Sequence, residues 1–224
     1  MIRFEAVDKV FRSRGLEKVI VNNASLDLPD RNIAVLGANG AGKSTLLRMI
    51  AGTELPTRGR IQRAGRMSWP LGLATGFNGS MTGIENVTFL ARIYGQDTER
   101  VIAFVEEFAE LGPSLKVPWS TYSSGMRARL AFSVSMAIAF DIYLVDEITA
   151  VGDANFKAKC HAAFRERRRS SRVVMVSHSM KTLRDYCDVG LVLLGGKLSF
   201  WEDLEDAIAY HEYLMGIASD AEED

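Results

Sequence analysis

An eight-residue segment near the N-terminus constrains the fold more than any other part of the sequence. Residues 37–44 read Gly-Ala-Asn-Gly-Ala-Gly-Lys-Ser, which is the spacing of a P-loop. The apolar segment Ile33–Leu36 precedes it, and apolar residues at helical spacing follow from about Lys43. A strand, a glycine-rich turn and a helix in this order predict an α/β fold in which the turn binds phosphate. The alternative interpretation is a glycine-rich turn that binds nothing.

Other short apolar segments predict the rest of a mainly parallel sheet. Ile142–Val145 and Val173–Val176 are almost continuously apolar, and helical patterns separate them. Such segments are typical of parallel strands that helices cover on both faces. Gly190–Leu194 and Lys197–Phe200 flank a Gly-Gly pair and predict a hairpin, which a final helix follows.

Two further regions depart from this strand pattern. Between residues 79 and 139, apolar residues such as Val101, Val105 and Phe108 recur at helical spacing. This region is predicted to be a mainly helical subdomain inserted into the core. Alternating apolar residues near the N-terminus predict a small antiparallel β subdomain; they are Ile2, Phe4, Leu26 and Leu28. The whole chain, residues 1–224, is interpreted as one domain with this insertion.

Charge and hydropathy narrow the classes of partner. The formal net charge is -1, so no overall basic field indicates nucleic acid. No apolar segment approaches the ~20 residues that cross a bilayer, and the N-terminus has no signal-peptide organisation. Cys160 and Cys187 fit no metal or redox spacing and are expected to be reduced thiols of a cytosolic protein. The arginines between Arg165 and Arg172 are expected to be a solvated helix C-terminus. Any action at a membrane is therefore expected to go through a partner.

The phosphate chemistry can be assigned to particular side chains. Small residues let backbone N–H groups surround a polyphosphate, Lys43 places a positive charge near the β- and γ-phosphates, and the Ser44 hydroxyl can bind Mg²⁺. The segment 142–145 leads into two carboxylates. Asp146 suits coordination of Mg²⁺ beside Ser44, and Glu147 suits polarisation of the water that attacks the γ-phosphate. Without the P-loop upstream, a plain exposed turn would explain these carboxylates equally well.

A third segment indicates the family. Residues 122–131 read Tyr-Ser-Ser-Gly-Met-Arg-Ala-Arg-Leu-Ala and lie shortly before the acidic strand. This segment resembles the signature motif of ABC ATPases, whose usual form is Leu-Ser-Gly-Gly-Gln followed by a basic, apolar helix. Ser123 or Ser124 would also cap a helix that begins near Met126, and both interpretations can hold. The resemblance covers essentially the whole chain and implies a P-loop NTPase (RecA-like) core that binds ATP and Mg²⁺.

The resemblance also implies roles for single residues. His178 is similar to the switch histidine that contacts the γ-phosphate, and it joins Glu147 as a catalytic residue. Residues 149–153 look like the D-loop, which crosses a dimer interface. Phe11 lies where the family places an aromatic residue that stacks on adenine. The nucleotide-binding residues implied are Phe11, Gly37, Asn39, Gly40, Ala41, Gly42, Lys43, Ser44, Thr45 and Asp146, with Ser123, Ser124 and Gly125 contributed by the opposite subunit of a homodimer.

Departures from the usual motifs narrow the family further. Ser124 replaces the first signature glycine and Met126 replaces the glutamine. No glutamine follows the third core strand, where Asn78 is the nearest amide that could contact Mg²⁺ or water. These departures belong to segments that together look like the ATPases of capsular polysaccharide exporters: residues 68–72, 76–80, 82–86, 122–126 and 150–153.

The same resemblance implies partners and a location. The chain would drive membrane permease subunits from the cytoplasmic face of the inner membrane, with periplasmic or outer-membrane export components beyond them and no nucleic acid. Side chains expected near the permease lie in and around the helical region: Trp69, Phe77, Met81, Phe89 and Tyr94.

Three alternatives remain open. ATPases that export O-antigen or teichoic acid share many of these segments, although O-antigen exporters often carry an extra sugar-binding domain for which residues up to Asp224 leave no room. ABC ATPases of DNA repair or translation usually carry two cassettes or long coiled-coil insertions, and this sequence has one cassette and no such heptads. A small-molecule P-loop kinase would need an acceptor pocket, and the signature motif, the D-loop and His178 argue against it.

Overall fold

The computed structural model of the chain describes residues 1–13, 15–71, 76–147 and 154–220, with side chains up to residue 216. It divides into two compact units. The first, the α/β unit, comprises Met1–Pro70, Ile142–Glu147 and Arg172–Asp224. The second, the helical unit, comprises Leu71–Asp141 and Ile148–Ser171.

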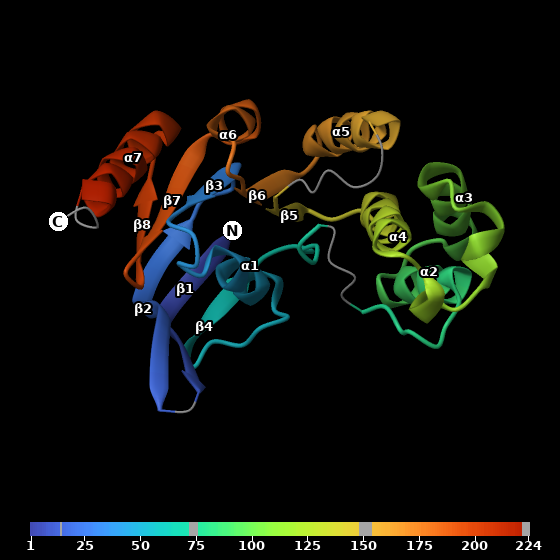
Figure 1. Cartoon of the computed structure of the whole chain (residues 1–224), viewed down its shortest axis with the longest axis horizontal. Helices are drawn as coiled ribbons and strands as arrows, with labels where there is room; N and C mark the ends of the chain where they lie inside the picture. Colours follow the sequence, from blue (N-terminus) through green and yellow to red (C-terminus); the bar gives the residue numbers. More distant parts are fainter. Residues whose placement is uncertain (14, 72–75, 148–153, 221–224) are drawn as a thin grey trace. The chain divides into compact units, whose positions relative to one another are not determined.

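A five-stranded sheet forms the centre of the α/β unit, with the strand order β5-β6-β3-β7-β8 (Figure 1). Neighbouring strands pair in parallel from β5 to β7, while β8 pairs with β7 as an antiparallel hairpin. The strands are β3 (Ile33–Leu36), β5 (Ile142–Asp146), β6 (Arg172–Val176), β7 (Val189–Leu194) and β8 (Lys197–Trp201). The almost unbroken apolar sequence of the parallel strands matches their burial on both faces. The predicted mainly parallel sheet and its hairpin are therefore confirmed.

The N-terminal residues form a separate antiparallel sheet of three strands, in the order β2-β1-β4. Its strands are β1 (Ile2–Ser13), β2 (Leu16–Leu28) and β4 (Arg58–Arg63). Phe4 pairs with Leu26 and Ile2 with Leu28, so the alternating apolar residues share one buried face. The antiparallel sheet was predicted from that alternation, but β4 was not, because only Ile61 of its six residues is buried.

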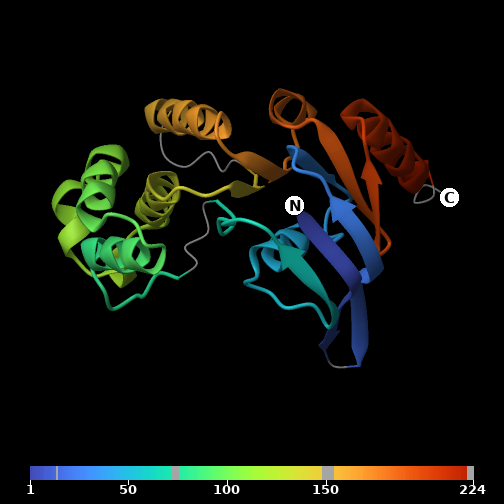
Figure 2. The same cartoon turned by 180° about the vertical axis from the view of Figure 1, so that it is seen from behind.

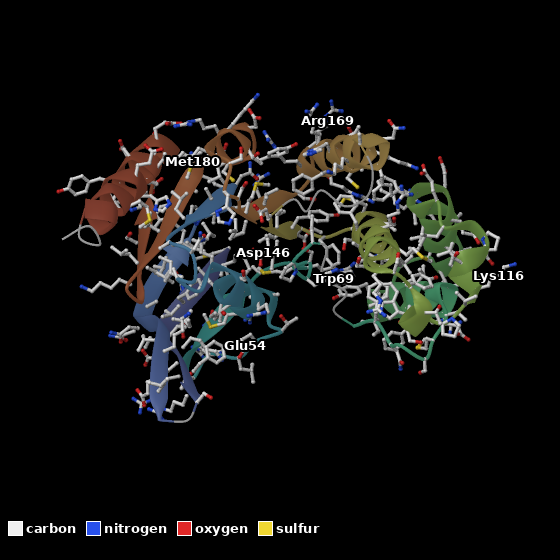
Figure 3. The ribbon with its side chains drawn as sticks, viewed as in Figure 1. Glu54, Trp69, Lys116, Asp146, Arg169 and Met180 are labelled. Atoms are coloured by element: carbon white, nitrogen blue, oxygen red, sulfur yellow. The ribbon has the colours of Figure 1, made fainter. Side chains whose placement is uncertain are left out.

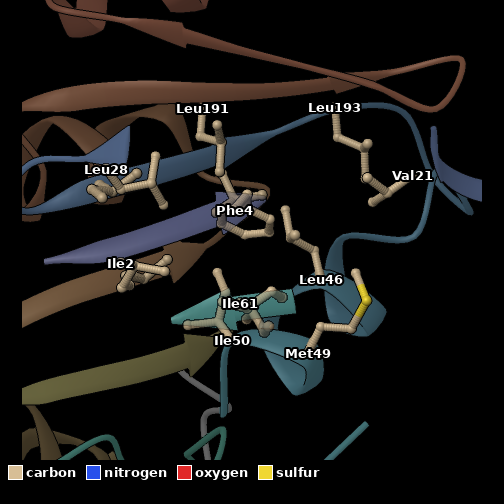
Figure 4. Close-up of a cluster of buried hydrophobic side chains, with 14 of the residues drawn as sticks. Ile2, Phe4, Val21, Leu28, Leu46, Met49, Ile50, Ile61, Leu191 and Leu193 are labelled. Atoms are coloured by element: carbon tan, nitrogen blue, oxygen red, sulfur yellow. The ribbon is translucent and has the colours of Figure 1, made fainter. Parts of the chain in front are cut away.

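Helices cover both faces of the five-stranded sheet. Helix α1 (Lys43–Ala51) packs on β5 and β6 on the same side as the antiparallel sheet, while α6 (Met180–Tyr186) and α7 (Leu204–Asp220) lie on the other side (Figures 1 and 2). Between the two sheets and α1 lies the main apolar core, shown in Figure 4 and including Ile2, Phe4, Val21, Leu28, Leu46, Met49, Ile50, Ile61, Leu191 and Leu193. This core holds the N-terminal strands beside the end of β3 from which α1 starts.

The helical unit contains α2 (Gly83–Ile93), α3 (Thr98–Ala109), α4 (Ser124–Ala137) and α5 (Ala154–Arg168), with short 3-10 turns at Gly112–Lys116 and Trp119–Thr121. Helix α2 begins with a full capping box, in which Thr82 and Glu85 satisfy each other's backbone N–H groups. Helix α3 ends at Ala109, and its C-cap residue, Glu110, has a left-handed backbone with a φ of 54°. The helices α2 to α4 fall within residues 79–139, and α5 packs against α4. The interpretation of the chain as a single domain with this insertion stays a prediction.

Several polar side chains of the helical unit form hydrogen bonds or ion pairs within it, and its cysteine is buried. Arg167 lies in the last turn of α5 and donates from Nε to the Met136 carbonyl at 2.9 Å, so it joins α5 to α4, while Arg169 lies beyond the helix and pairs with Glu166 (Figure 3). Cys160 is buried, and burial raises the pKa of its thiol to about 12. Cys187, in the α/β unit, is buried as well. In the described part of the chain, no helix is both long enough and apolar enough to cross a bilayer.

Candidate nucleotide-binding site

The phosphate loop, Gly37–Ser44, joins β3 to α1 in a conformation that requires glycine. Gly42 has a φ of 108°, and a Cβ atom there would collide with Ile20 of β2. At Gly37 a Cβ atom would lie 2.5 Å from the Leu193 carbonyl oxygen of β7. Neighbouring backbone and side chains thus leave no room for larger residues at these two positions. The loop fits a polyphosphate because its backbone can approach the ligand closely.

Helix α1 offers its N-terminus to whatever occupies this loop. Its N-cap residue is Gly42, which supplies no side-chain cap, and its first turn carries no acidic residue. The Leu46 N–H already bonds the Gly42 carbonyl at 2.9 Å, whereas the earlier N–H groups point out of the helix end. Thr45 is buried and Ser44 is exposed, so the hydroxyl predicted to bind Mg²⁺ is accessible. A helix start of this kind favours an anion.

Lys43 spans the loop from the first turn of α1. Its ammonium donates hydrogen bonds to the carbonyl oxygens of Gly37 and Ala38, at 2.6 and 2.9 Å. Burial lowers the pKa of Lys43, while the negative charges of Asp146 and Glu147 act in the opposite direction. The structure therefore brings the predicted lysine and the two predicted carboxylates into one electrostatic neighbourhood.

The two carboxylates lie at the carboxyl end of β5. Asp146 is the last residue of the strand, is half-buried and pairs in register with Val176 of β6 (Figure 3). Glu147 is exposed, and its backbone N–H donates to the Val176 carbonyl at 2.9 Å. Its φ of 55° is unusual for a residue with a side chain. Since β3, β5 and β6 run parallel, these residues lie at the same sheet edge as the phosphate loop.

His178 follows β6 at this edge, in the turn that leads to α6. Ser177 and Ser179 build the turn: the Ser177 hydroxyl accepts from the Ser179 N–H at 3.1 Å, and the Ser179 hydroxyl accepts from the Thr182 N–H at 3.2 Å. The His178 side chain is exposed. This arrangement presents the imidazole to solvent from a turn whose backbone is fixed, which suits contact with a ligand.

Phe11 lies near the end of β1 and is 40% exposed. The ammonium of Lys9 lies 4.6 Å from the ring centroid, and the same ammonium pairs with Glu54. Phe11 stands opposite Lys18 of β2, and the Lys18 ammonium lies 3.9 Å from the position of a Cβ atom at Gly40. The sheet face that carries Phe11 is therefore the one turned toward the phosphate loop.

The signature segment, Tyr122–Ala131, starts helix α4 in the helical unit. Ser123 is the N-cap residue, and its hydroxyl accepts from the Met126 N–H at 3.2 Å, as predicted for the capping alternative. Ser123, Ser124 and Gly125 are exposed. A Cβ atom at Gly125 would meet only the Ser123 hydroxyl, at 4.0 Å. These three residues therefore form an open polar surface at a helix start.

Asn78 is also in the helical unit, and its side chain forms hydrogen bonds within its own loop. Its Oδ1 accepts from the Ser80 N–H at 3.0 Å and from the Ser80 hydroxyl at 2.8 Å. Its backbone N–H donates to Asn86, which is fully buried. These bonds shape the loop before α2, and the predicted contact of Asn78 with Mg²⁺ or water stays a prediction. The predicted D-loop, residues 149–153, lies outside the described residues.

The aromatic residues expected to contact the permease have different environments. Phe77 stacks on Trp119 with ring centroids 4.4 Å apart, and Tyr94 meets Phe140 edge-on at 5.2 Å. Trp69 is 4% exposed, whereas Phe89 is 45% exposed. Phe89 is the exposed member of these four, while Phe77 and Tyr94 are half-buried.

Two features of the site could not be found from the motifs. Lys9 and Glu54 form an ion pair between β1 and the segment after α1, and Lys18 extends to Gly40 from β2. Neither lysine belongs to a recognised motif. The pairing register of β1 with β2 places Lys18 beside Gly40. That register depends on β-bulges, which cannot be predicted from the sequence pattern.

Comparisons with known proteins agree with this geometry. Residues 21–150 match the ABC transporter family. The chain is 47% identical to the polysialic acid transport ATP-binding protein KpsT of Escherichia coli, over 96% of this chain and 97% of that protein. It is 44% identical to the capsule polysaccharide export ATP-binding protein CtrD of Neisseria meningitidis serogroup B, over 96% of this chain and all of that protein.

The fold has solved counterparts too. A dimeric ATP-binding cassette, MJ0796, solved in a post-hydrolysis state with ADP and Pi, matches 91% of this chain and 99% of its own with a TM-score of 0.72. At 20% identity this likeness supports the P-loop NTPase fold. With the family match and these relatives, the chain belongs to the ABC transporter family.

Proposed function

We propose that this protein is the ATP-binding and ATP-hydrolysing subunit of an exporter of capsular polysaccharide. The observation that carries the ATPase part is the single neighbourhood formed by the glycine-constrained phosphate loop, Lys43, Asp146 and Glu147. The export part rests on relatives of 44–47% identity that are named for transport of polysialic acid or capsule polysaccharide.

In this proposal each residue has a defined task. Lys43 and the loop N–H groups bind the phosphates, and the Phe11 ring stacks on adenine with the face that Lys9 does not cover. Ser44 and Asp146 would hold Mg²⁺, which supplies positive charge to the phosphate oxygens when bound. Glu147 accepts a proton from the attacking water, and His178 contacts the γ-phosphate. These residues all belong to the α/β unit.

A second copy of the chain completes the site. Ser123, Ser124 and Gly125 would face the γ-phosphate bound by the opposite subunit, so two subunits would enclose two ATP molecules. Their exposure on the helical unit supports this role, because nothing in the described residues covers them. Permease subunits would bind the helical unit at the cytoplasmic face of the inner membrane, where Phe89 is a candidate contact.

Deletion of the gene in its own host tests the assignment. Surface polysaccharide should be lost, and polysaccharide should accumulate inside the cell, since its synthesis does not need the exporter. The wild-type gene should restore the surface polymer, and a gene carrying Glu147→Gln should not. Unchanged surface polysaccharide after deletion, with altered transport of a small molecule, would overturn the substrate and leave the ATPase assignment intact.

A further inference from the structure

Lys18 places a positive charge at the phosphate loop from outside any motif. It lies on β2 directly opposite Phe11 of β1, and residues that pair in this way share one face of a sheet. Its ammonium is the nearest atom to the open side of Gly40, 3.9 Å from where a Cβ atom would stand. The Lys18 side chain thus extends from beside Phe11, which is proposed to stack on adenine, to Gly40 in the middle of the phosphate loop.

The backbone of β2 holds Lys18 in this place. Ile20, two residues further along β2, fills the space at Gly42 of the phosphate loop. On the other side, the Asn22 N–H donates to the Gly196 carbonyl at 2.7 Å, and Val19 packs against Gly196 in the turn between β7 and β8. Contacts on both sides therefore fix β2 against the loop, although the Lys18 side chain itself is exposed.

The charge of Lys18 is not used by an acidic neighbour. In the described residues no carboxylate pairs with it. The other basic residues of the hairpin that the structure describes are all paired: Arg3 with Asp27, Lys9 with Glu54, and Arg12 with Glu17. An unpaired ammonium beside a loop of exposed N–H groups adds to the positive potential there. Phosphate oxygens are the ligands that such a charge attracts.

We propose that Lys18 binds the phosphate chain of the nucleotide, at the part that ADP and ATP share. The inference rests on the nucleotide site proposed above. Because Lys18 stands between Phe11 and Gly40, its ammonium lies where a nucleotide stacked on Phe11 would enter the loop. It would act as a second cation, complementary to Lys43, which approaches the same chain from the helix.

Calorimetric titration of the purified protein with ADP and with ATP tests this role. Lys18→Ala should weaken binding of both nucleotides about threefold to tenfold, a modest effect because an exposed charge is screened by water and salt. Lys18→Arg should bind within about twofold of wild type, since the charge remains. Lys116→Ala removes one exposed lysine from the helical unit and serves as the matched control, with wild-type binding expected.

The outcomes separate this inference from the proposed site. Equal affinities for Lys18→Ala and Lys116→Ala would overturn the role of Lys18, as would a loss confined to ATP. Lys43→Ala, measured alongside, tests the site itself: if it binds nucleotide like wild type, the phosphate loop is misassigned. Thermal unfolding without nucleotide should give the same midpoint for wild type and Lys18→Ala, because an exposed alanine at this position disturbs no buried contact.

Discussion

The phosphate loop and the signature segment are both short polar turns that start a helix, yet they are built in opposite ways. At the start of α1, Gly42 provides no cap, and neighbouring residues leave no space for side chains at Gly37 and Gly42. At the start of α4, Ser123 caps its own helix, and the space around Gly125 is open. The first turn is confined by residues of its own unit, whereas the second presents an exposed polar surface.

This difference indicates how the catalytic work is divided. The phosphate loop has its lysine, its helix N-terminus and two carboxylates in one unit, so it should bind nucleotide without help. The signature segment has a hydroxyl and small residues but no charge partner, so it should act only against a nucleotide held by another subunit. Binding and hydrolysis should therefore respond differently to changes in the two turns.

The largest expected effect comes from Lys43. Lys43→Ala removes the ammonium that spans the loop and also leaves the carbonyls of Gly37 and Ala38 without their donor. ATP affinity should fall about 100-fold or more, because charge-assisted bonds to phosphate are among the stronger hydrogen bonds. Calorimetric titration measures this loss. Wild-type affinity in a folded variant would show that the loop does not bind the phosphates.

Ser123 should give a smaller effect on binding and a large one on hydrolysis. Ser123→Arg replaces the cap of α4 with a long side chain on the exposed surface, so ATP affinity of the isolated subunit should change less than about threefold, while ATPase activity should fall at least tenfold. The control is Ser123→Thr, which keeps the cap and should retain most of the activity.

Mixtures of variants sharpen the same comparison. Subunits carrying Ser123→Arg, combined with subunits carrying Lys43→Ala, form one intact composite site and one destroyed site. Partial activity in the mixture, above that of either variant alone, is expected. If the activity of a strictly monomeric protein equals that of wild type, the signature segment does not act on an opposite subunit.

Asn78 should give the smallest effect. Asn78→Ala removes two bonds to Ser80 and leaves the backbone bond to Asn86, so a loss of about 1 kcal/mol in unfolding free energy is expected for a turn with one exposed polar side chain. Thermal or urea unfolding measures it. If Asn78 also contacts the nucleotide site, transport-coupled ATPase activity should fall more than basal activity; equal values in the two assays assign it to the loop alone.

Much of the fold could be predicted because the local pattern of apolar and polar residues matches the burial of each element in the structure. The strands β3, β5 and β6 are apolar at almost every position, since helices or sheets cover both of their faces, and the N-cap at Ser123 follows from residue type. Strand β4 is different: it is nearly all exposed, and its pairing with β1 depends on residues distant in sequence. Such pairing leaves little trace in local composition.

In the candidate site too, features that depend on pairing between distant residues could not be predicted from the sequence. Lys43, Asp146 and Glu147 belong to sequence motifs whose residue spacing predicts phosphate binding. In the structure, both carboxylates lie close enough to Lys43 to interact with its charge. Lys18 reaches Gly40 only through the register of β1 with β2, which shifts at bulges between Phe4 and Val10. The positive φ of Glu147 is equally invisible in the sequence, because glutamate rarely adopts the left-handed region and nothing in the residue type predicts it.

The central claim is that one subunit holds ATP and a second subunit completes the site for hydrolysis. Glu147→Gln tests it most directly, because the amide keeps the shape of the carboxylate while losing its capacity to accept a proton. Light scattering after gel filtration should show a dimer, about twice the 24.8 kDa of the chain, with ATP and Mg²⁺ but not with ADP, and hydrolysis should fall at least 100-fold. A variant that stays monomeric with ATP and hydrolyses it at the wild-type rate would contradict the account.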